Sequence, residues 1–222
     1  MISSLRRAVT RALAMLLGRK KFTFDGGSFT VSEGVLNPTL FRASMVFARE
    51  ALNTAGSEPI SILELGSGSG LASVALARKD HRVTAVDRSL EATVNTAANA
   101  RNNGVTVRTV CSDWDTALDP DLTFDLVVMN PPFLPSPTPV FKDALWGGPN
   151  LHIVEDALNA AVRRLKPDGR VLLLTSVRSG RTDVLQVVKA SGLTPISERT
   201  VRHWGEKLHF DLLGQLPWAS QP

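Results

Sequence analysis

Residues that form covalent cross-links and metal sites are scarce in this sequence. Cys111 is the single cysteine among 222 residues, which excludes an intrachain disulfide and a cysteine-based zinc site. A chain with so little cysteine fits a reducing, cytoplasmic setting. The 4 histidines show none of the spacings of metal ligands, so the sequence predicts no metal site.

Long apolar runs and concentrated charge are missing as well. No apolar stretch reaches the roughly 18 residues that a membrane-spanning helix needs, so no membrane role is expected. The net charge of +4 and the pI of about 9.6 are mildly basic, without the clustered cations of a dedicated nucleic-acid binder. With 43% hydrophobic residues the chain can form a full core and is not expected to be disordered.

Three regions are expected along the chain: 1–20, 21–56 and 57–222. The first reads as an amphipathic helix. Such a basic helix suits a targeting or membrane-surface role, but packing on its own domain is favoured and no signal-peptide cleavage site follows. The second region reads as a β-hairpin that turns at 25–27, followed by a helix at 39–55.

Strand and helix patterns alternate in the third region. The expected helices cover 71–79, 90–104, 151–165 and 182–192, and the expected strands cover 61–65, 82–87, 105–114, 124–129, 170–177 and two segments between 193 and 214. This alternation predicts an α/β fold with a Rossmann-like, seven-stranded, mostly parallel sheet and helices on both faces. The last two strands are expected as an antiparallel pair at the edge.

The stretch FDLVVMNPPF, at 124–133, carries the sharpest chemical signal. Pro131 and Pro132 end the strand because neither can donate to a sheet ladder, so Asn130 lies where ligands bind in open α/β sheets. The Asn130 side-chain carbonyl and the Pro131 backbone carbonyl offer two acceptors to one NH2 group, and Phe133 offers a ring for stacking. Holding both hydrogens out of plane would free the nitrogen lone pair. The alternative interpretation is a plain proline-rich turn.

A glycine-rich turn, ELGSGSG at 64–70, follows one strand and opens a helix, where the backbone can approach a ligand closely. Asp87 ends the next strand and suits ribose hydroxyls, while Asp113 and Trp114 follow the third and suit an exocyclic amine and a stacked ring. Glu64 would repel the phosphates of a dinucleotide and would suit a cation such as S-adenosylmethionine. Each acid alone is also an ordinary strand-end residue, but together they favour a cofactor site.

With these motifs the chain resembles the class I S-adenosylmethionine-dependent methyltransferases that carry an NPPF motif. It is most similar to the HemK/PrmC-like protein glutamine N5-methyltransferases, in the short form without an N-terminal helical domain. Three further segments are similar to that family, over roughly residues 22–214: FDGGSFTVSEGVLNP, ALWGGPNLHIVEDAL and LKPDG.

The resemblance implies a role for each matching residue. S-adenosyl-L-methionine, which leaves as S-adenosyl-L-homocysteine, would be bound by Glu64, Gly66, Ser67, Gly68, Gly70, Asp87, Arg88, Asp113, Trp114 and Asn130. The catalytic group that holds the methyl acceptor would be Asn130, Pro131, Pro132 and Phe133, with Asn37 and Trp146 as further substrate-binding candidates. The short branch of the family works with a small zinc-binding activator protein, which becomes a candidate partner here.

The resemblance fails at one place and leaves the methyl acceptor open. Release-factor enzymes carry a P-R-P-x-T-E-like segment after the hairpin, whereas residues 37–44 read NPTLFRAS, without the glutamate. The N-P-P-aromatic motif also occurs in ribosomal RNA guanine, tRNA or DNA adenine, and small-amine methyltransferases. A protein glutamine is therefore the favoured acceptor, and a nucleic-acid base or a small amine is the alternative. An intact NPPF beside an intact cofactor loop argues against a non-catalytic binding module.

Overall fold

A computed structural model describes residues 20–40, 43–134, 146–203 and 205–215. The helix expected at the N-terminus lies outside these ranges, as does most of the proline-rich loop after the NPPF motif. Among the described helices, none is long and apolar enough to cross a membrane.

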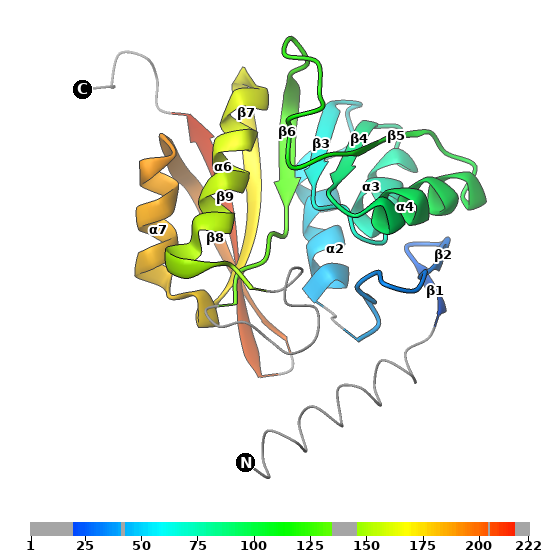
Figure 1. Cartoon of the computed structure of the whole chain (residues 1–222), viewed down its shortest axis with the longest axis horizontal. Helices are drawn as coiled ribbons and strands as arrows, with labels where there is room; N and C mark the ends of the chain where they lie inside the picture. The colour runs from blue at the N-terminus through cyan, green and yellow to red at the C-terminus, as the bar shows by residue number, and fades with distance from the viewer. Residues whose placement is uncertain (1–19, 41–42, 135–145, 204, 216–222) are drawn as a thin grey trace.

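Within the described residues, seven strands form one sheet in the order β5–β4–β3–β6–β7–β9–β8 (Figure 1). Neighbouring strands from β5 to β7 are parallel, and β9 is antiparallel to both β7 and β8. The predicted mostly parallel sheet is therefore confirmed. The strands are β3 Ser61–Leu65, β4 Arg82–Asp87, β5 Val107–Cys111, β6 Phe124–Met129, β7 Leu165–Ser176, β8 Leu193–His203 and β9 Glu206–Gln215.

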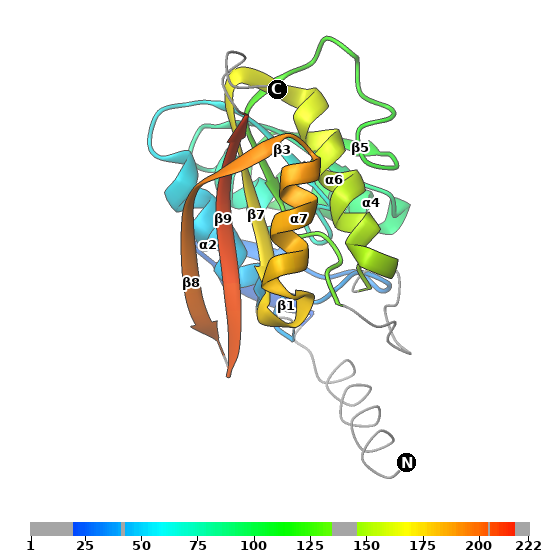
Figure 2. The same ribbon diagram turned by 90° about the vertical axis from the view of Figure 1, so that its left-hand side faces the viewer.

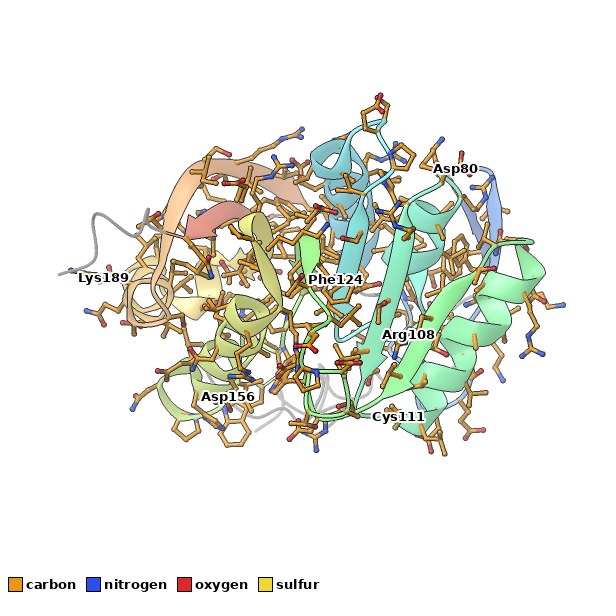
Figure 3. The ribbon with its side chains drawn as sticks, turned by 90° about the horizontal axis from the view of Figure 1, so that it is seen from above. Asp80, Arg108, Cys111, Phe124, Asp156 and Lys189 are labelled. Atoms are coloured by element: carbon orange, nitrogen blue, oxygen red, sulfur yellow. The ribbon has the colours of Figure 1, made fainter. Side chains whose placement is uncertain are left out.

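Helices cover both faces of the sheet, as predicted. The helices α2 (Ala43–Ala55), α3 (Leu71–Ala77) and α4 (Leu90–Asn102) share one apolar core with one face. The helices α6 (His152–Arg164) and α7 (Arg181–Ala190) share the other core (Figure 2). Short 3-10 turns, η1 Pro149–Leu151 and η2 Val177–Ser179, precede α6 and α7. Figure 3, from above, shows β5 with Arg108 and Cys111 at one end of the sheet and α7 with Lys189 at the other.

The predicted hairpin consists of β1 Lys21–Phe24 and β2 Gly27–Thr30. Its two-residue turn, Asp25-Gly26, has positive φ at both positions, 47° and 75°, which matches the twist of a tight hairpin. The rings of Phe22 and Phe29 stack with their centroids 5.4 Å apart. Both rings belong to the core that α2 and α3 share with the sheet, so the hairpin packs directly on the main domain.

Two element boundaries differ from the sequence-based expectation. The helix expected from residue 39 is observed from Ala43, because Asn37 to Leu40 form a turn closed by a bond from the Leu40 amide to the Asn37 carbonyl, 3.0 Å. The strand expected from Arg170 begins at Leu165, and its register with β6 shifts between Phe124 and Leu126. The LKPDG turn is therefore an irregular segment at the start of β7.

The first turn of α3 packs against α4 at a glycine. Gly70 has φ +75°, and a Cβ there would lie 2.7–2.9 Å from atoms of Thr96, including its Cα. Gly66 has a similar φ of +79°, but a Cβ there would meet no atom within 4 Å. The backbone conformation favours glycine at both positions, and only Gly70 also needs it for helix packing.

This difference gives a matched pair of variants. Gly66→Ala should lower the free energy of unfolding by about 1–2 kcal/mol, the penalty of a left-handed non-glycine residue. Gly70→Ala should lose a further ~1–3 kcal/mol because Thr96 must be displaced. Urea unfolding without added ligand measures both values, and an equal loss in the two variants would contradict the packing role of Gly70.

Candidate active site

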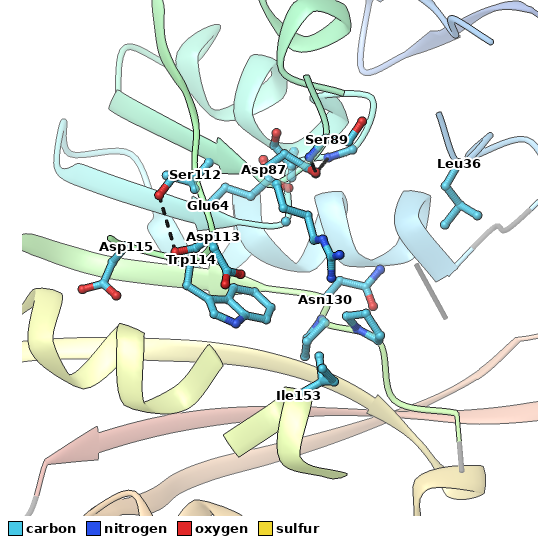
Figure 4. A pocket seen from close by; sticks show the side chains of 18 of the residues that line it. Leu36, Glu64, Asp87, Ser89, Ser112, Asp113, Trp114, Asp115, Asn130 and Ile153 are labelled. Atoms are coloured by element: carbon cyan, nitrogen blue, oxygen red, sulfur yellow. Dashed lines mark hydrogen bonds between the residues drawn. The ribbon is translucent and has the colours of Figure 1, made fainter. Parts of the chain in front are cut away.

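A cavity of about 830 Å³ opens where β3, β4, β5 and β6 end (Figure 4). The loops after these four strands form its floor, while α6 forms a wall on one side and α2 with residues 34–36 forms a wall on another. Its volume lies in the range of small-molecule and cofactor sites.

The floor of the cavity is set by strand register. Leu65 at the end of β3 pairs with Val86 of β4 on one side and with Met129 of β6 on the other. The residues that follow these three paired positions therefore lie at the same height along the sheet: Gly66, Asp87 and Asn130. All three line the cavity.

The glycine turn is fastened to β4 by its own backbone. The amides of Gly66 and Ser67 both donate to the Val86 carbonyl, at 2.8 and 3.0 Å. Gly66, Ser67 and Gly68 line the cavity, as the sequence predicts for a cofactor loop. Gly70 was predicted as a cofactor residue too, but it does not line the cavity and lies against Thr96 instead.

Asp87 joins two of the loops. Its Oδ2 accepts from the Gly68 amide at 2.8 Å, and its Oδ1 accepts from the Ser89 amide at 2.9 Å. A carboxylate has about four acceptor positions, so roughly two remain for hydroxyl groups of a ligand. Arg88 follows Asp87 and also lines the cavity. The predicted role of Asp87 at a ribose stays a prediction.

The loop after β5 carries Asp113 and Trp114 into the cavity. Trp114 is half-buried and has φ +47°, which is unusual for a residue with a large side chain. The loop is held by Asp115, a residue that the sequence analysis missed. Its carboxylate accepts from Arg164 Nε at 2.7 Å and from Arg163 Nη2 at 2.6 Å.

This ion-pair cluster is almost completely buried at its centre. Asp115 is 2% exposed and Arg164 is 7% exposed. Burial pushes the pKa of Asp115 upward, but the hydrogen bonds from Arg163 and Arg164 outweigh it and hold the pKa below its usual value. Arg164 also donates to the carbonyls of Asp119 and Pro120, so one guanidinium fixes the whole loop to α6.

Glu64 lies beneath the glycine turn and is 3% exposed. It accepts from the Ser73 amide at 2.8 Å and from the Ser73 hydroxyl. Burial raises the pKa of Glu64 to about 8, even though the bonds from Ser73 act in the opposite direction. The expectation that Glu64 presents a carboxylate to a cationic ligand therefore holds only if the ligand changes the ionisation of Glu64. A bound cation would lower this pKa and bring the group to its ionised form.

Asn130 reaches the cavity with an unoccupied amide. It is half-buried, lines the cavity with Pro131 and Pro132, and makes no side-chain hydrogen bond with the other described residues. Phe133, predicted to stack on the acceptor, does not line the cavity and packs against both apolar cores. A Cβ at Gly147 would lie 3.0 Å from the Pro132 carbonyl oxygen, so a glycine lets the chain at this position pass close to the motif.

The two further substrate candidates lie outside the cavity lining. The Asn37 side-chain carbonyl accepts from the amide and the hydroxyl of Thr39, both at 2.9 Å. Trp146 forms an isolated parallel bridge with Leu134. Instead, four residues near the hairpin and on α2 form that end of the cavity: Gly34, Leu36, Ser44 and Phe47.

One face of α6 lines the opposite wall, which the sequence analysis also missed. The four residues follow helical spacing, and three of them are polar: Ile153, Asp156, Asn159 and Arg163. The spacing was visible in the sequence, but nothing there indicates which side of an amphipathic helix faces a cavity. Across the described part of the chain, no group of three potential metal ligands is suitably placed for an ion.

Residues 42–191 match the family model described as a methyltransferase small domain. The chain belongs to the methyltransferase small-domain family. A release factor glutamine methyltransferase from Pasteurella multocida is 34% identical over 146 residues, which are 59% of this chain and 48% of that protein. Another, from Caulobacter vibrioides, is 33% identical over 193 residues, 85% of this chain and 61% of that protein. The chain thus spans about half to three fifths of the length of these two relatives.

Solved methyltransferase structures share the fold. The 16S rRNA N2 G1207 methyltransferase of Thermus thermophilus, solved with AdoMet and guanosine, aligns with a TM-score of 0.61 at 23% identity. The alignment covers 86% of this chain and 49% of that one. The putative methyltransferase SMU.776, complexed with SAH, gives a TM-score of 0.65 at 16% identity, covering 88% and 56%. At these identities the likeness shows the fold alone.

The buried Glu64 gives a pH-dependent stability. Its pKa is 4.5 in the unfolded chain and about 8 in the folded one, so between these values the folded state binds the extra proton. The free energy of unfolding should therefore fall with rising pH in this window, by up to about 1.4 kcal/mol per unit from this group. Glu64→Gln should flatten the slope, as measured by urea unfolding at several pH values. Identical slopes for the two proteins would show that Glu64 ionises normally.

Proposed function

We propose that this methyltransferase-family protein transfers a methyl group from S-adenosyl-L-methionine to a planar NH2 group, with the glutamine side chain of a protein as the favoured acceptor. The observation that carries the proposal is the position of Asn130. Its unoccupied amide enters the same cavity as the glycine turn and Asp87, so an acceptor NH2 group and a cofactor would meet there.

The residues of the cavity fit this cofactor. Asp87 keeps free acceptor positions for ribose hydroxyls, and Asp113 and Trp114 offer a carboxylate and a ring at the adenine end. Gly66 and Gly68 leave room for close approach of the methionine part. Glu64 can become an anion beside a cationic ligand. S-adenosyl-L-methionine, when bound, supplies an electrophilic methyl group and leaves as S-adenosyl-L-homocysteine.

Catalysis by this chain would depend on positioning and on aimed acceptors. The Asn130 side-chain carbonyl and the Pro131 carbonyl hold the two hydrogens of the acceptor nitrogen and turn its lone pair toward the methyl group. Positive charge develops on the nitrogen as the new bond forms, and these two oxygens stabilise it. Pro131 and Pro132 keep the carbonyls in place because their backbone has little freedom. The methylated nitrogen is then cationic and strongly acidic, and it would release its extra proton to water after the transfer, so the scheme needs no general base.

A protein acceptor is supported by the relatives named release factor glutamine methyltransferase. Because this chain spans only part of their length, the acceptor needs its own test. Labelled methyl groups from S-adenosyl-L-methionine, transferred in a lysate, should end in material that protease degrades. Label that nuclease removes would instead favour a nucleic-acid base, and label in small molecules a free amine. If a zinc-binding activator protein is a partner, adding it should raise the rate of methyl transfer.

Asp87 should determine cofactor affinity. Asp87→Ala removes a charged acceptor, so binding of S-adenosyl-L-methionine should weaken by about 1.5–3 kcal/mol, or roughly tenfold to a hundredfold. Asp87→Asn keeps one acceptor oxygen and should lose less. Calorimetry measures both variants, and wild-type affinity in Asp87→Ala would remove Asp87 from the cofactor site.

Asn130 should affect turnover more than cofactor affinity. Asn130→Ala should lower kcat by on the order of 10²-fold, because the lost acceptor acts mainly on the charge that develops during transfer. Asn130→Asp keeps an oxygen and should retain part of the activity. Asn102→Ala makes the same change on the exposed end of α4 and should leave the rate unchanged. If Asn130→Ala binds cofactor and methylates at the wild-type rate, the NPPF motif is only the end of a strand.

A further inference from the structure

Two asparagines of α4 and a third that caps its C-terminal end hold the hairpin by its backbone. Asn95, Asn99 and Asn103 are spaced four residues apart and so share one face of the helix. Their side-chain carbonyls accept from the amides of three alternate residues along β2 and just beyond it, at 2.7, 2.8 and 2.9 Å: Ser32, Thr30 and Ser28. The asparagines therefore occupy the edge of β2 that a third strand would otherwise use.

The amide donors of the same side chains complete the contact. Asn95 and Asn99 each donate to the Thr30 carbonyl at 2.9 Å, and Asn103 donates to the Ser28 carbonyl at 2.7 Å. Asn95 and Asn99 are 1% and 0% exposed. Buried amides with paired donors and acceptors fix a position strongly, because each broken bond would leave an unsatisfied group.

Asn99 differs from Asn95 and Asn103 in a contact outside the hairpin. Its amide also donates to the Ser69 carbonyl, in the glycine turn, at 2.8 Å. One turn earlier on α4, the Thr96 hydroxyl lies 3.2 Å from the Ser67 hydroxyl and 3.3 Å from the Gly68 carbonyl. One face of α4 thus holds the glycine turn and the hairpin together, and only Asn99 binds both directly among the three asparagines.

The hairpin in turn places part of the cavity wall. The chain leaves β2 through Ser32, whose amide is fixed by Asn95, and reaches Gly34 and Leu36 within four residues. Gly34 and Leu36 line the same cavity as the glycine turn. A shift of the hairpin would therefore move a wall of the cavity.

We infer that Asn99 is a positioning residue that couples the glycine turn to the hairpin. Ligand binding at the glycine turn then stabilises the cavity wall at 34–36, and a loosened hairpin lowers the affinity for the ligand. The linkage is reciprocal, because two sites that share one free energy affect each other equally. The inference rests on the proposed function for the identity of the ligand, S-adenosyl-L-methionine.

Asn103 provides the matched control. Asn103→Ala and Asn99→Ala each remove contacts to the hairpin backbone, but only the second removes the bond to the glycine turn. Calorimetry should show that Asn99→Ala binds S-adenosyl-L-methionine about tenfold more weakly than wild type, the scale of one buried hydrogen bond. Asn103→Ala should stay within about twofold of wild type, since it leaves the turn intact.

Hydrogen exchange at the Ser32 amide reports the coupling itself, because its partner Asn95 is unchanged in both variants. S-adenosyl-L-methionine should slow this exchange in wild type and in Asn103→Ala, and should slow it much less in Asn99→Ala, where the Thr96 contacts still join the turn to α4. If Asn99 had a purely structural role, Asn99→Ala would change the rate of Ser32 amide exchange by the same factor with and without the ligand.

Three results would overturn the inference: equal losses of affinity in the two variants, wild-type affinity in Asn99→Ala, or no effect of the ligand on Ser32 exchange in wild type. The last comparison needs no variant, so it can overturn the inference even if Asn99→Ala does not fold. A wild-type protein that binds no S-adenosyl-L-methionine contradicts the proposed function first. Binding without coupling contradicts this inference alone.

Discussion

The parallel register of β3 with β4 and β6 is the constraint on which the rest of the site depends. Because Leu65 pairs with both Val86 and Met129, the backbone leaves three adjacent strands at the same height. The chain turns in opposite directions on the two sides of β3, and such a switch point leaves a crevice at the strand ends. The glycine turn, the acidic residue and the asparagine meet there without any long-range adjustment.

Buried polar groups then hold the crevice open in a fixed shape. Arg164 fastens the β5 loop through Asp115, and Ser73 fastens Glu64 under the glycine turn. Polar groups in such places are costly unless every donor and acceptor is paired, so each one specifies a single arrangement more than it adds stability. The cavity walls come from parts of the chain as distant as the segment after the hairpin and α6.

Local patterns made much of this structure predictable. Alternating apolar runs and turn residues are sufficient to predict the strands, and the Asp25-Gly26 turn predicts the hairpin, because these features depend on near neighbours. The glycine pattern does not distinguish Gly66, at the cavity, from Gly70, against Thr96. That difference depends on a helix 26 residues away (96 − 70), which no local pattern contains.

The same reason explains the other departures. Phe133 follows a motif for stacking but packs into the cores, since two apolar layers meet beside it. Asp115 and Arg164 read as ordinary surface charges, because a buried ion pair requires knowledge of which two segments touch. The insertion of β9 between β7 and β8 is a matter of topology, which strand periodicity does not encode.

The contact between α4 and β2 has a consequence for how such proteins diversify. The asparagines bind β2 mainly through its peptide groups, and Ser28 and Ser32 are recognised at their backbone amides. A peptide group is nearly the same whatever side chain it carries, proline excepted. The outward side chains of the hairpin are thus not needed for attachment, and substitutions there can change that surface while the docking geometry stays the same.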